Sequence, residues 1–239
     1  MDREKRIFGL TGNQLKLIAL LTMTIDHIGV FLIPVNTVQY EICRIIGRLA
    51  MPIFAWMIAE GCRYTKNRFR YLLTLLGFGI FSQAVELIFE DSLHMCILIT
   101  FALSVILIYM LEYSQKKKNF FTLCLLGGTF LAICYVCVFL PQDIPHLEFD
   151  VDYGIYGVLL PVLIYMGRSH REKLLLTAMG LVPMAIYYGL IQWFSLASLL
   201  LLAMYNGQRG KMKLKYLFYI YYPAHLGALY VITVLLAIW

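Results

Sequence analysis

Ionisable side chains lie inside apolar segments of this 239-residue chain, where they need either partners or a task. The first apolar segment contains Lys16, Asp26 and His27. A histidine can accept and return a proton near neutral pH, and a lysine or an arginine can hold an anion. Each such residue costs roughly 2.5–3.5 kcal/mol at the centre of a membrane helix, so these positions are candidates for function. The others in or against apolar segments are Arg44, Arg48, Glu60, Glu86 and His225.

Lys16 and His27 are spaced so that both side chains lie on the same face of a helix. Eleven steps of about 100° end about 20° past three full turns, with a rise of about 16 Å. Leu20 and Met23 fall on the same stripe. Lys16 could also be a lysine that reaches to the membrane surface, and His27 a packed histidine bonded to another helix. Asp26 could orient a histidine or pair with an arginine across the bundle.

Arg44 and Arg48 are four residues apart and therefore share a helix face. The connection before their segment is short, so the first two segments are expected to be neighbours, with the arginines at the depth of Asp26 and His27. One interpretation is a structural bridge between an aspartate and an arginine. The other is a polar site that holds His27 and one or two cations, and both can be true together.

Three further features complete the set of candidates. Glu60 ends the second apolar segment, which we expect Pro52 to break in its middle. His225, in the last segment, is a packed or hydrogen-bonded histidine or a member of the site. The basic residues after Glu60 either mark membrane topology or meet a phosphate-rich ligand; they are Arg63, Lys66, Arg68 and Arg70.

The elements that carry these residues are membrane helices. The chain is 61% hydrophobic and 14% charged, with a mean hydropathy of +0.76, whereas soluble domains are about half apolar and a quarter charged. We therefore predict an all-α bundle of about nine spans in a single integral-membrane domain, 1–239. The stretch 172–205 is divided in two, because about 34 residues are too long for one crossing. The predicted spans are 14–33, 41–61, 70–89, 95–112, 119–140, 153–167, 173–188, 190–205 and 216–238.

Lysine and arginine gather in alternate connections, and the connections 34–40, 90–94 and 141–152 contain neither. Basic short loops mark the cytoplasmic side. The N-terminus is therefore predicted inside and the C-terminus outside, in a multi-pass protein of the cell membrane. The basic groups are Arg3, Lys5 and Arg6; Arg63, Lys66, Arg68 and Arg70; Lys116, Lys117 and Lys118; Arg168, Arg171 and Lys173; and Arg209, Lys211, Lys213 and Lys215.

The net charge of +6 follows from this topology and does not indicate a nucleic-acid partner, which would require a basic soluble surface. Cys134 and Cys137 have the C-x-x-C spacing but lie in an apolar segment without a nearby histidine. A zinc site needs four converging ligands, so we expect no metal here.

Several short motifs, in order along nearly the whole chain, resemble the TraX family, the conjugation proteins linked to N-terminal acetylation of pilin. The motifs are Gln14-Leu-Lys-Leu-Ile with Ile25-Asp-His-Ile-Gly29, Arg44-Ile-Ile-Gly-Arg48, Pro52-Ile-Phe54, Glu60-Gly61, Asp152-Tyr-Gly-Ile-Tyr-Gly-Val158, Tyr205-Asn-Gly-Gln-Arg-Gly210 and Phe218-Tyr-Ile-Tyr-Tyr-Pro-Ala-His225.

That family is similar to a wider group of membrane acyltransferases, which move acyl groups from a cytoplasmic thioester to an acceptor on the other face. The resemblance implies that His27 is catalytic and that Lys16 is its basic partner. With acetyl-CoA as the donor, Lys16, Arg63 and Arg68 would hold its phosphates. His27 would act as general base or acyl carrier, and Arg44 or Arg48 would stabilise the oxyanion. The acceptor, a peptide or a glycan outside the cytoplasm, is left open.

Two other classes of function remain open from the sequence. Histidine, aspartate and arginine within membrane segments also occur in proton relays and transport paths. Against a carrier, the chain has no evident internal repeat and no paired broken helices. A non-catalytic scaffold would use the same polar residues only to hold helices together.

Overall fold

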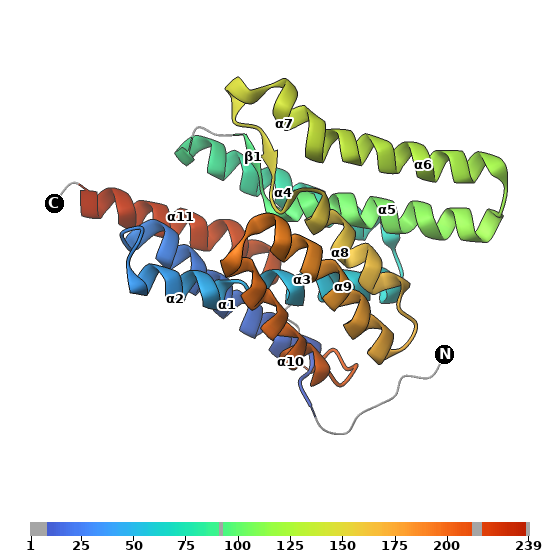
Figure 1. Ribbon diagram of the computed structural model, residues 1–239, viewed down its shortest axis with the longest axis horizontal. Coiled ribbons are helices and arrows are strands. Elements are labelled where there is room, and N and C mark those ends of the chain that lie inside the picture. Colours follow the sequence, from blue (N-terminus) through green and yellow to red (C-terminus); the bar gives the residue numbers. More distant parts are fainter. Residues whose placement is uncertain (1–8, 91–92, 212–216, 238–239) are drawn as a thin grey trace. The chain divides into compact units, whose positions relative to one another are not determined.

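A computed structural model describes residues 9–90, 93–211 and 217–237, and nearly all of its regular structure is helical (Figure 1). Among these residues, six helices are long and apolar enough to cross a membrane. The protein is therefore an all-α, multi-pass membrane protein. The basic residues Arg3, Lys5, Arg6, Lys213 and Lys215 lie outside the described residues.

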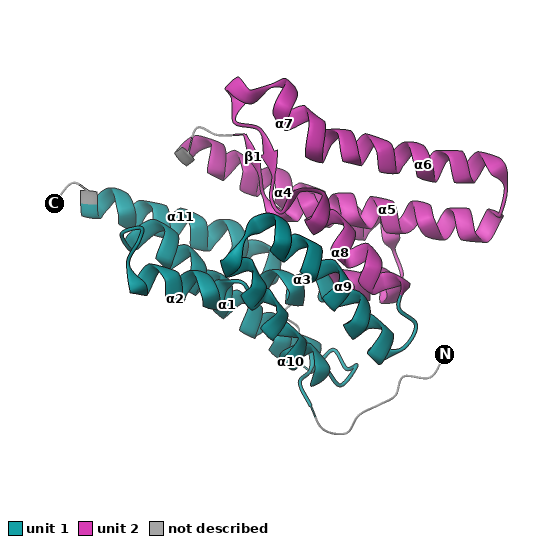
Figure 2. Ribbon diagram, viewed as in Figure 1, with its two compact units in different colours: residues 1–57, 167–239 teal, residues 58–166 magenta. Residues whose placement is uncertain are grey.

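The chain divides into two compact units, and α3 (Ala50–Tyr64) passes from the first into the second (Figure 2). Unit 1 comprises residues 1–57 and 167–239, and unit 2 comprises residues 58–166. The prediction of one domain stays a prediction. The other helices of unit 1 are α1 (Gly12–Leu32), α2 (Val38–Gly47), α9 (His170–Tyr188), the 3-10 helix η3 (Leu190–Ala197), α10 (Ser198–Ala203) and α11 (Leu217–Ala237).

The start of α1 is closed by a capping box and by a distant loop. The Thr11 side chain accepts a hydrogen bond from the Gln14 amide, and the Gln14 side chain accepts one from the Thr11 amide. The Asn13 amide donates to the Arg209 carbonyl at 2.9 Å. These bonds satisfy amides that a helix start leaves without partners. They also fix the segment 204–210 beside the first turn of α1.

The helices α1 and α11 run parallel to each other. Contacts along the described part of both helices join residues whose numbers rise together. These contacts include Lys16 with Phe218, Thr24 with Tyr221, His27 with His225, and Phe31 with Thr233. Lys16 and His27 therefore both lie on the face of α1 that meets α11, as their spacing predicts.

The second predicted span is divided, but not where we expected. The helix α2 ends at Gly47, Arg48 and Leu49 form a turn, and α3 begins at Ala50. Pro52 is the third residue of α3, a position whose amide has no partner within the helix. The expected break at Pro52 is wrong: the proline is compatible with the first turn of a new helix, and the interruption precedes it.

The stretch 172–205 is divided as predicted. The helix α9 ends at Tyr188, and Gly189 has φ +89° and ψ −168°, a backbone conformation that favours glycine. The 3-10 helix η3 follows and packs against α9. A 3-10 helix has about three residues per turn, so residues three apart eclipse one another. Three polar residues at this spacing are buried: Gln192, Ser195 and Ser198.

Unit 2 is a set of helices with one short parallel ladder. Strands β1 (His94–Met95) and β2 (Asp150–Val151) pair, so the connections 90–94 and 141–152 meet at one end of this unit. These are two of the connections that lack lysine and arginine. The helices are α4 (Arg68–Glu90), α5 (Ile97–Lys117), α6 (Phe120–Cys134), the π-helix η1 (Tyr135–Phe139), α7 (Leu140–Asp143), the 3-10 helix η2 (Pro145–Leu147) and α8 (Gly154–Met166).

Among the described residues, the six candidate spans account for six of the nine predicted crossings. The three remaining predicted spans coincide with α8, with α9 and with η3 together with α10, which are shorter or less apolar. The candidate spans are Gly12–Leu32, Val38–Tyr64, Arg68–Ile88, Ile97–Lys117, Phe120–Asp143 and Leu217–Leu236.

Candidate functional site

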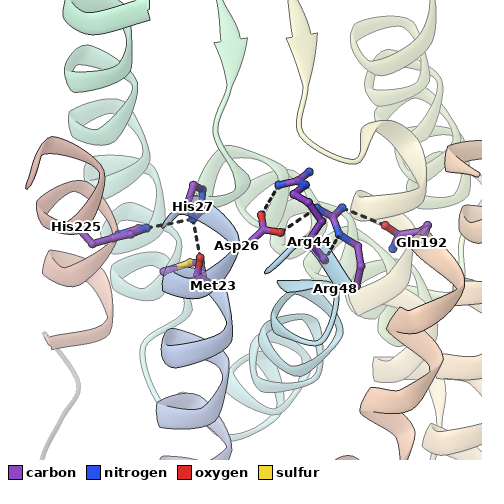
Figure 3. A network of polar contacts seen from close by, with 7 residues as sticks. All are labelled: Met23, Asp26, His27, Arg44, Arg48, Gln192 and His225. Carbon is purple, nitrogen blue, oxygen red and sulfur yellow. Dashed lines mark hydrogen bonds and ion pairs between the residues drawn. The ribbon is translucent and has the colours of Figure 1, made fainter. Parts of the chain in front are cut away.

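Polar side chains gather on two sides of α1 within unit 1 (Figure 3). Asp26 points toward the arginines of the segment that follows, and His27 points toward His225 on α11 (Figure 3). Consecutive residues of an α-helix are about 100° apart, so one helix can serve both groups. Asp26 is thus a partner of arginines and not of the neighbouring histidine ring.

Asp26 forms two ion pairs. Arg44 Nη1 lies 2.6 Å from Asp26 Oδ2, and Arg48 Nη2 lies 3.2 Å from Asp26 Oδ1. The Asp26 and Arg48 side chains are 13% and 12% exposed. The predicted bridge between helices is therefore confirmed, and it includes both arginines. One carboxylate against two guanidinium groups leaves this cluster with a formal charge of +1.

Gly47 permits the close approach of α2 to Asp26. A Cβ atom at Gly47 would lie 2.1 Å from Asp26 Oδ1 and 2.3 Å from Asp26 Cβ. Real Cβ atoms essentially never approach other atoms so closely. The ion pairs of Asp26 therefore depend on the absence of a side chain at this position.

Gln192 extends the cluster into η3. Arg48 Nη1 donates to Gln192 Oε1 at 3.2 Å, and Arg48 Nε donates to the Arg44 carbonyl at 3.3 Å. Gln192 is only 2% exposed. Sequence reasoning missed this residue because it carries no charge. Its spacing from Ser195 and Ser198 was the available signal.

The protonation of His27 follows from its partners. Its Nδ1 lies 2.8 Å from the Met23 carbonyl oxygen, which can only accept a hydrogen bond, so Nδ1 carries the proton. In the neutral ring Nε2 then has a free lone pair, as a general base requires. His225 Nε2 lies 3.3 Å from His27 Nδ1, and the two rings meet edge to face at 4.9 Å.

Lys16 lies near the other end of α1. Its Nζ is 5.0 Å from the centre of the Phe218 ring, and the charge of Arg209 acts on it. Arg209 comes close because the loop that contains it is bonded to the first turn of α1. Two basic residues, Lys16 and Arg209, therefore lie near the start of the helix that carries His27. Sequence reasoning used Arg209 only for topology, since its neighbours in space are distant in sequence.

Arg63, Arg68 and Glu60 lie in unit 2, whereas Lys16 lies in unit 1. Arg68 forms an ion pair with Glu112, which also accepts a hydrogen bond from the Tyr165 hydroxyl. Arg63 donates to the Tyr165 carbonyl, and its guanidinium lies 5.2 Å from the centre of the Tyr165 ring. Glu60 is a buried residue of α3. These arginines thus have partners within their own unit.

Comparison with known proteins gives a family for this chain. The family model "TraX protein" matches residues 11–233. A probable fimbrial assembly protein, FimC of serogroup H1 from Dichelobacter nodosus, is 25% identical over 90% of this chain and 93% of its own length. The uncharacterized protein RP591 from Rickettsia prowazekii (strain Madrid E) is 28% identical over 67% of this chain and 57% of its own length. No solved structure matches. On the extent of the family match, the chain belongs to the TraX family.

Proposed function

We propose that the protein is a membrane-embedded acetyltransferase. It moves an acetyl group from cytoplasmic acetyl-CoA to a hydroxyl or amine acceptor at the outer face. The observation that carries the proposal is the state of His27, whose Nδ1–H is bonded to the Met23 carbonyl. This bond leaves Nε2 as a base within a membrane segment.

In the proposed reaction, His27 Nε2 removes the proton of the acceptor as the acceptor attacks the thioester carbon. A new bond from acetyl to oxygen or nitrogen forms, and the bond from acetyl to sulfur breaks. The proton on Nε2 then passes to the departing thiolate of coenzyme A. Charge and atoms balance without a metal or a redox partner. An acyl group carried on Nε2 itself would be the nucleophilic variant of the same site.

The arginine cluster supports this chemistry through its charge. Arg44 and Arg48 outnumber Asp26, and both act electrostatically on the His27 ring. A fixed positive charge in a water-poor site stabilises a developing oxyanion more than the same charge would in water. The ion pairs also join α1 to α2, so this cluster serves structure as well.

The donor is proposed to bind from the start of α1. The phosphates of acetyl-CoA are anionic, and Lys16 with Arg209 offers two cations there. Lys16 and His27 share the face of α1 toward α11, about 16 Å apart along the axis. The pantetheine arm would follow this face from the cations to His27. Arg209 replaces Arg63 and Arg68 in this assignment, because those two have partners in unit 2.

We also propose nine crossings, with the N-terminus inside and the C-terminus outside. The parallel course of α1 and α11 supports an odd number of crossings, because both are candidate spans. Six crossings, an even number, would make the first and last helices antiparallel. At least one of the shorter elements must then cross as well, and nine is the count that places every basic connection on one face.

The acceptor is proposed to be a protein N-terminus or a glycan outside the cytoplasm. The relative from Dichelobacter nodosus is named for fimbrial assembly, and fimbrial subunits would be protein acceptors of this kind. Under this proposal the protein acts in the modification of pilus or conjugation components.

The test uses purified protein in liposomes with radiolabelled acetyl-CoA on the cytoplasmic face. Release of free thiol and binding of acetyl-CoA are measured for the wild type, Lys16→Ala and His27→Ala. We expect His27→Ala to bind the donor without turnover, and Lys16→Ala to bind it more weakly. Absence of acetyl-CoA binding in all three would refute the proposal. Flux of an intact solute without consumption of acetyl-CoA would identify a transporter instead.

A further inference from the structure

The hydrogen-bond partners of His225 determine which of its ring nitrogens donates and which accepts. The proposed reaction described above gives this arrangement no role. His225 is 7% exposed, and its Nδ1 lies 2.9 Å from the Tyr221 carbonyl oxygen. A carbonyl oxygen only accepts, so Nδ1 carries the proton and Nε2 has a free lone pair. That lone pair lies 3.3 Å from His27 Nδ1, which carries a proton because of Met23. The two histidines therefore meet as acceptor and donor.

We propose that His225 is a positioning residue for His27, whose Nδ1–H is held jointly by His225 Nε2 and the Met23 carbonyl. The inference rests on the proposed function, because it assigns His225 to the same reaction. Its consequence is that His27 Nε2 stays unprotonated and in a fixed direction before the acceptor binds. The role of the orienting group falls to a neutral imidazole, while the carboxylate next to His27 in sequence, Asp26, is bonded to arginines.

A relay of protons through His225 does not fit the same contacts. The Nδ1–H of His225 points at a main-chain carbonyl, which cannot pass a proton onward. His225 is instead suited to accept a hydrogen bond that strengthens when His27 becomes charged. Hydrogen bonds that involve an ionised group are roughly twice as strong as neutral ones. His225 thus stabilises the charged His27 ring that forms when His27 takes the proton of the acetyl acceptor.

Neighbouring groups hold His225 in this orientation. The Tyr221 ring stacks on it at 5.2 Å with an angle of 11°, and the Tyr222 ring meets it at 5.6 Å. The Tyr221 hydroxyl lies 2.7 Å from Thr24 Oγ1. Thr24 donates its own hydroxyl proton to the Leu20 carbonyl, so it accepts the proton of Tyr221. These hydrogen bonds and ring contacts join α1 and α11 around the histidine pair.

Two near-isosteric variants separate positioning from packing. In His225→Gln the side-chain amide can place an oxygen where Nε2 was, so the acceptor for His27 is kept. In His225→Asn the shorter amide can keep the hydrogen bond to the Tyr221 carbonyl but cannot reach His27. Loss of the acceptor from a site where a charge develops is expected to lower kcat about tenfold. His225→Gln is expected to lose no more than about threefold, with the KM for acetyl-CoA unchanged in both.

The first readout needs no activity. Solid-state NMR of protein labelled with ¹⁵N-histidine in bilayers reports which ring nitrogen carries a proton and which nitrogens are close. We expect a cross-peak between the protonated Nδ1 of His27 and the unprotonated Nε2 of His225. This cross-peak between the two rings should be lost in His27→Asn and in His225→Asn. A protonated His225 Nε2, or an unprotonated His27 Nδ1 in the wild type, overturns the inference.

The second readout is the kinetic difference between the two variants in the liposome assay. Equal loss of kcat in His225→Gln and His225→Asn, with intact folding, overturns the inference and reduces His225 to packing. If the wild type neither binds nor consumes acetyl-CoA, the proposed function fails. The NMR result then still decides whether the histidine pair has the inferred protonation.

Discussion

Substitution Gly47→Ala tests whether the ion pairs of Asp26 depend on the bare backbone of α2. The added Cβ would lie 2.1 Å from Asp26 Oδ1, and ordinary contact begins at 3.4 Å, so the atoms must separate by 1.3 Å. The carboxylate now holds Arg44 at 2.6 Å and Arg48 at 3.2 Å. Hydrogen bonds of this kind have donor–acceptor distances of about 2.7–3.2 Å, so a shift of this size breaks at least one pair.

The expected cost is set by two opposing effects. Separating one partner of a buried ion pair costs about 3–5 kcal/mol. The alanine at Gly47 returns at most about 1 kcal/mol through helix propensity. We therefore expect Gly47→Ala to lower the free energy of unfolding by about 2–4 kcal/mol. Gly77→Ala in α4, where an added Cβ has no neighbour within 4 Å, is expected to raise the free energy of unfolding by about 0.5–1 kcal/mol.

The free energy of unfolding would be measured by titration with SDS in mixed micelles, for both glycine variants and the wild type. In an Asp26→Gly background, where the clashing atoms are gone, Gly47→Ala should cost little. If Gly47→Ala is as stable as Gly77→Ala, or equally harmful with and without the Asp26 side chain, the reasoning about close approach is refuted.

Three further predictions each concern the substitution of a single residue. Asp26→Asn leaves two arginines without their carboxylate and should lower the free energy of unfolding by about 3–5 kcal/mol, measured by the same titration; a loss below about 1 kcal/mol would contradict the cluster described above. Arg209→Ala should raise the Kd for acetyl-CoA about tenfold in a filter-binding assay, whereas Lys211→Ala should change it less than about threefold; equal effects would assign both to topology alone. Tyr221→Phe keeps the stacked ring but removes the hydroxyl bond to Thr24, and should cost about 0.5–1.5 kcal/mol of unfolding free energy, with an unchanged stability as the contrary result.

Helical periodicity predicts which site residues share one face of a helix. A short connection predicts that two successive helices lie side by side. Lys16 and His27 share a face because helix geometry fixes the angle between them. The bridge from Asp26 to Arg44 follows from a short connection between two helices. Such predictions depend only on local geometry and on the cost of charge in a membrane.

Contacts across long stretches of chain could not be predicted in this way. Arg209 lies near the first turn of α1 only because its loop is bonded there, and Gln192 bonds to Arg48 from η3. The division of the second span was misplaced to Pro52, because a proline is tolerated within a first helical turn. Hydropathy alone does not give the number of crossings, because two of the nine predicted segments are short and a third, α9, is less apolar.

The sequence separations of the polar contacts imply an order of assembly during synthesis. Asp26 is followed by Arg44 and Arg48 only 18 and 22 residues later, so these ion pairs can form as soon as the first two helices have been made. His27 meets His225 across 198 residues. A chain released before its last helix therefore holds the ion pairs but lacks the histidine pair. The Asp26 carboxylate has its arginine partners early, whereas the contact between His27 and His225 forms only once α11 has been made.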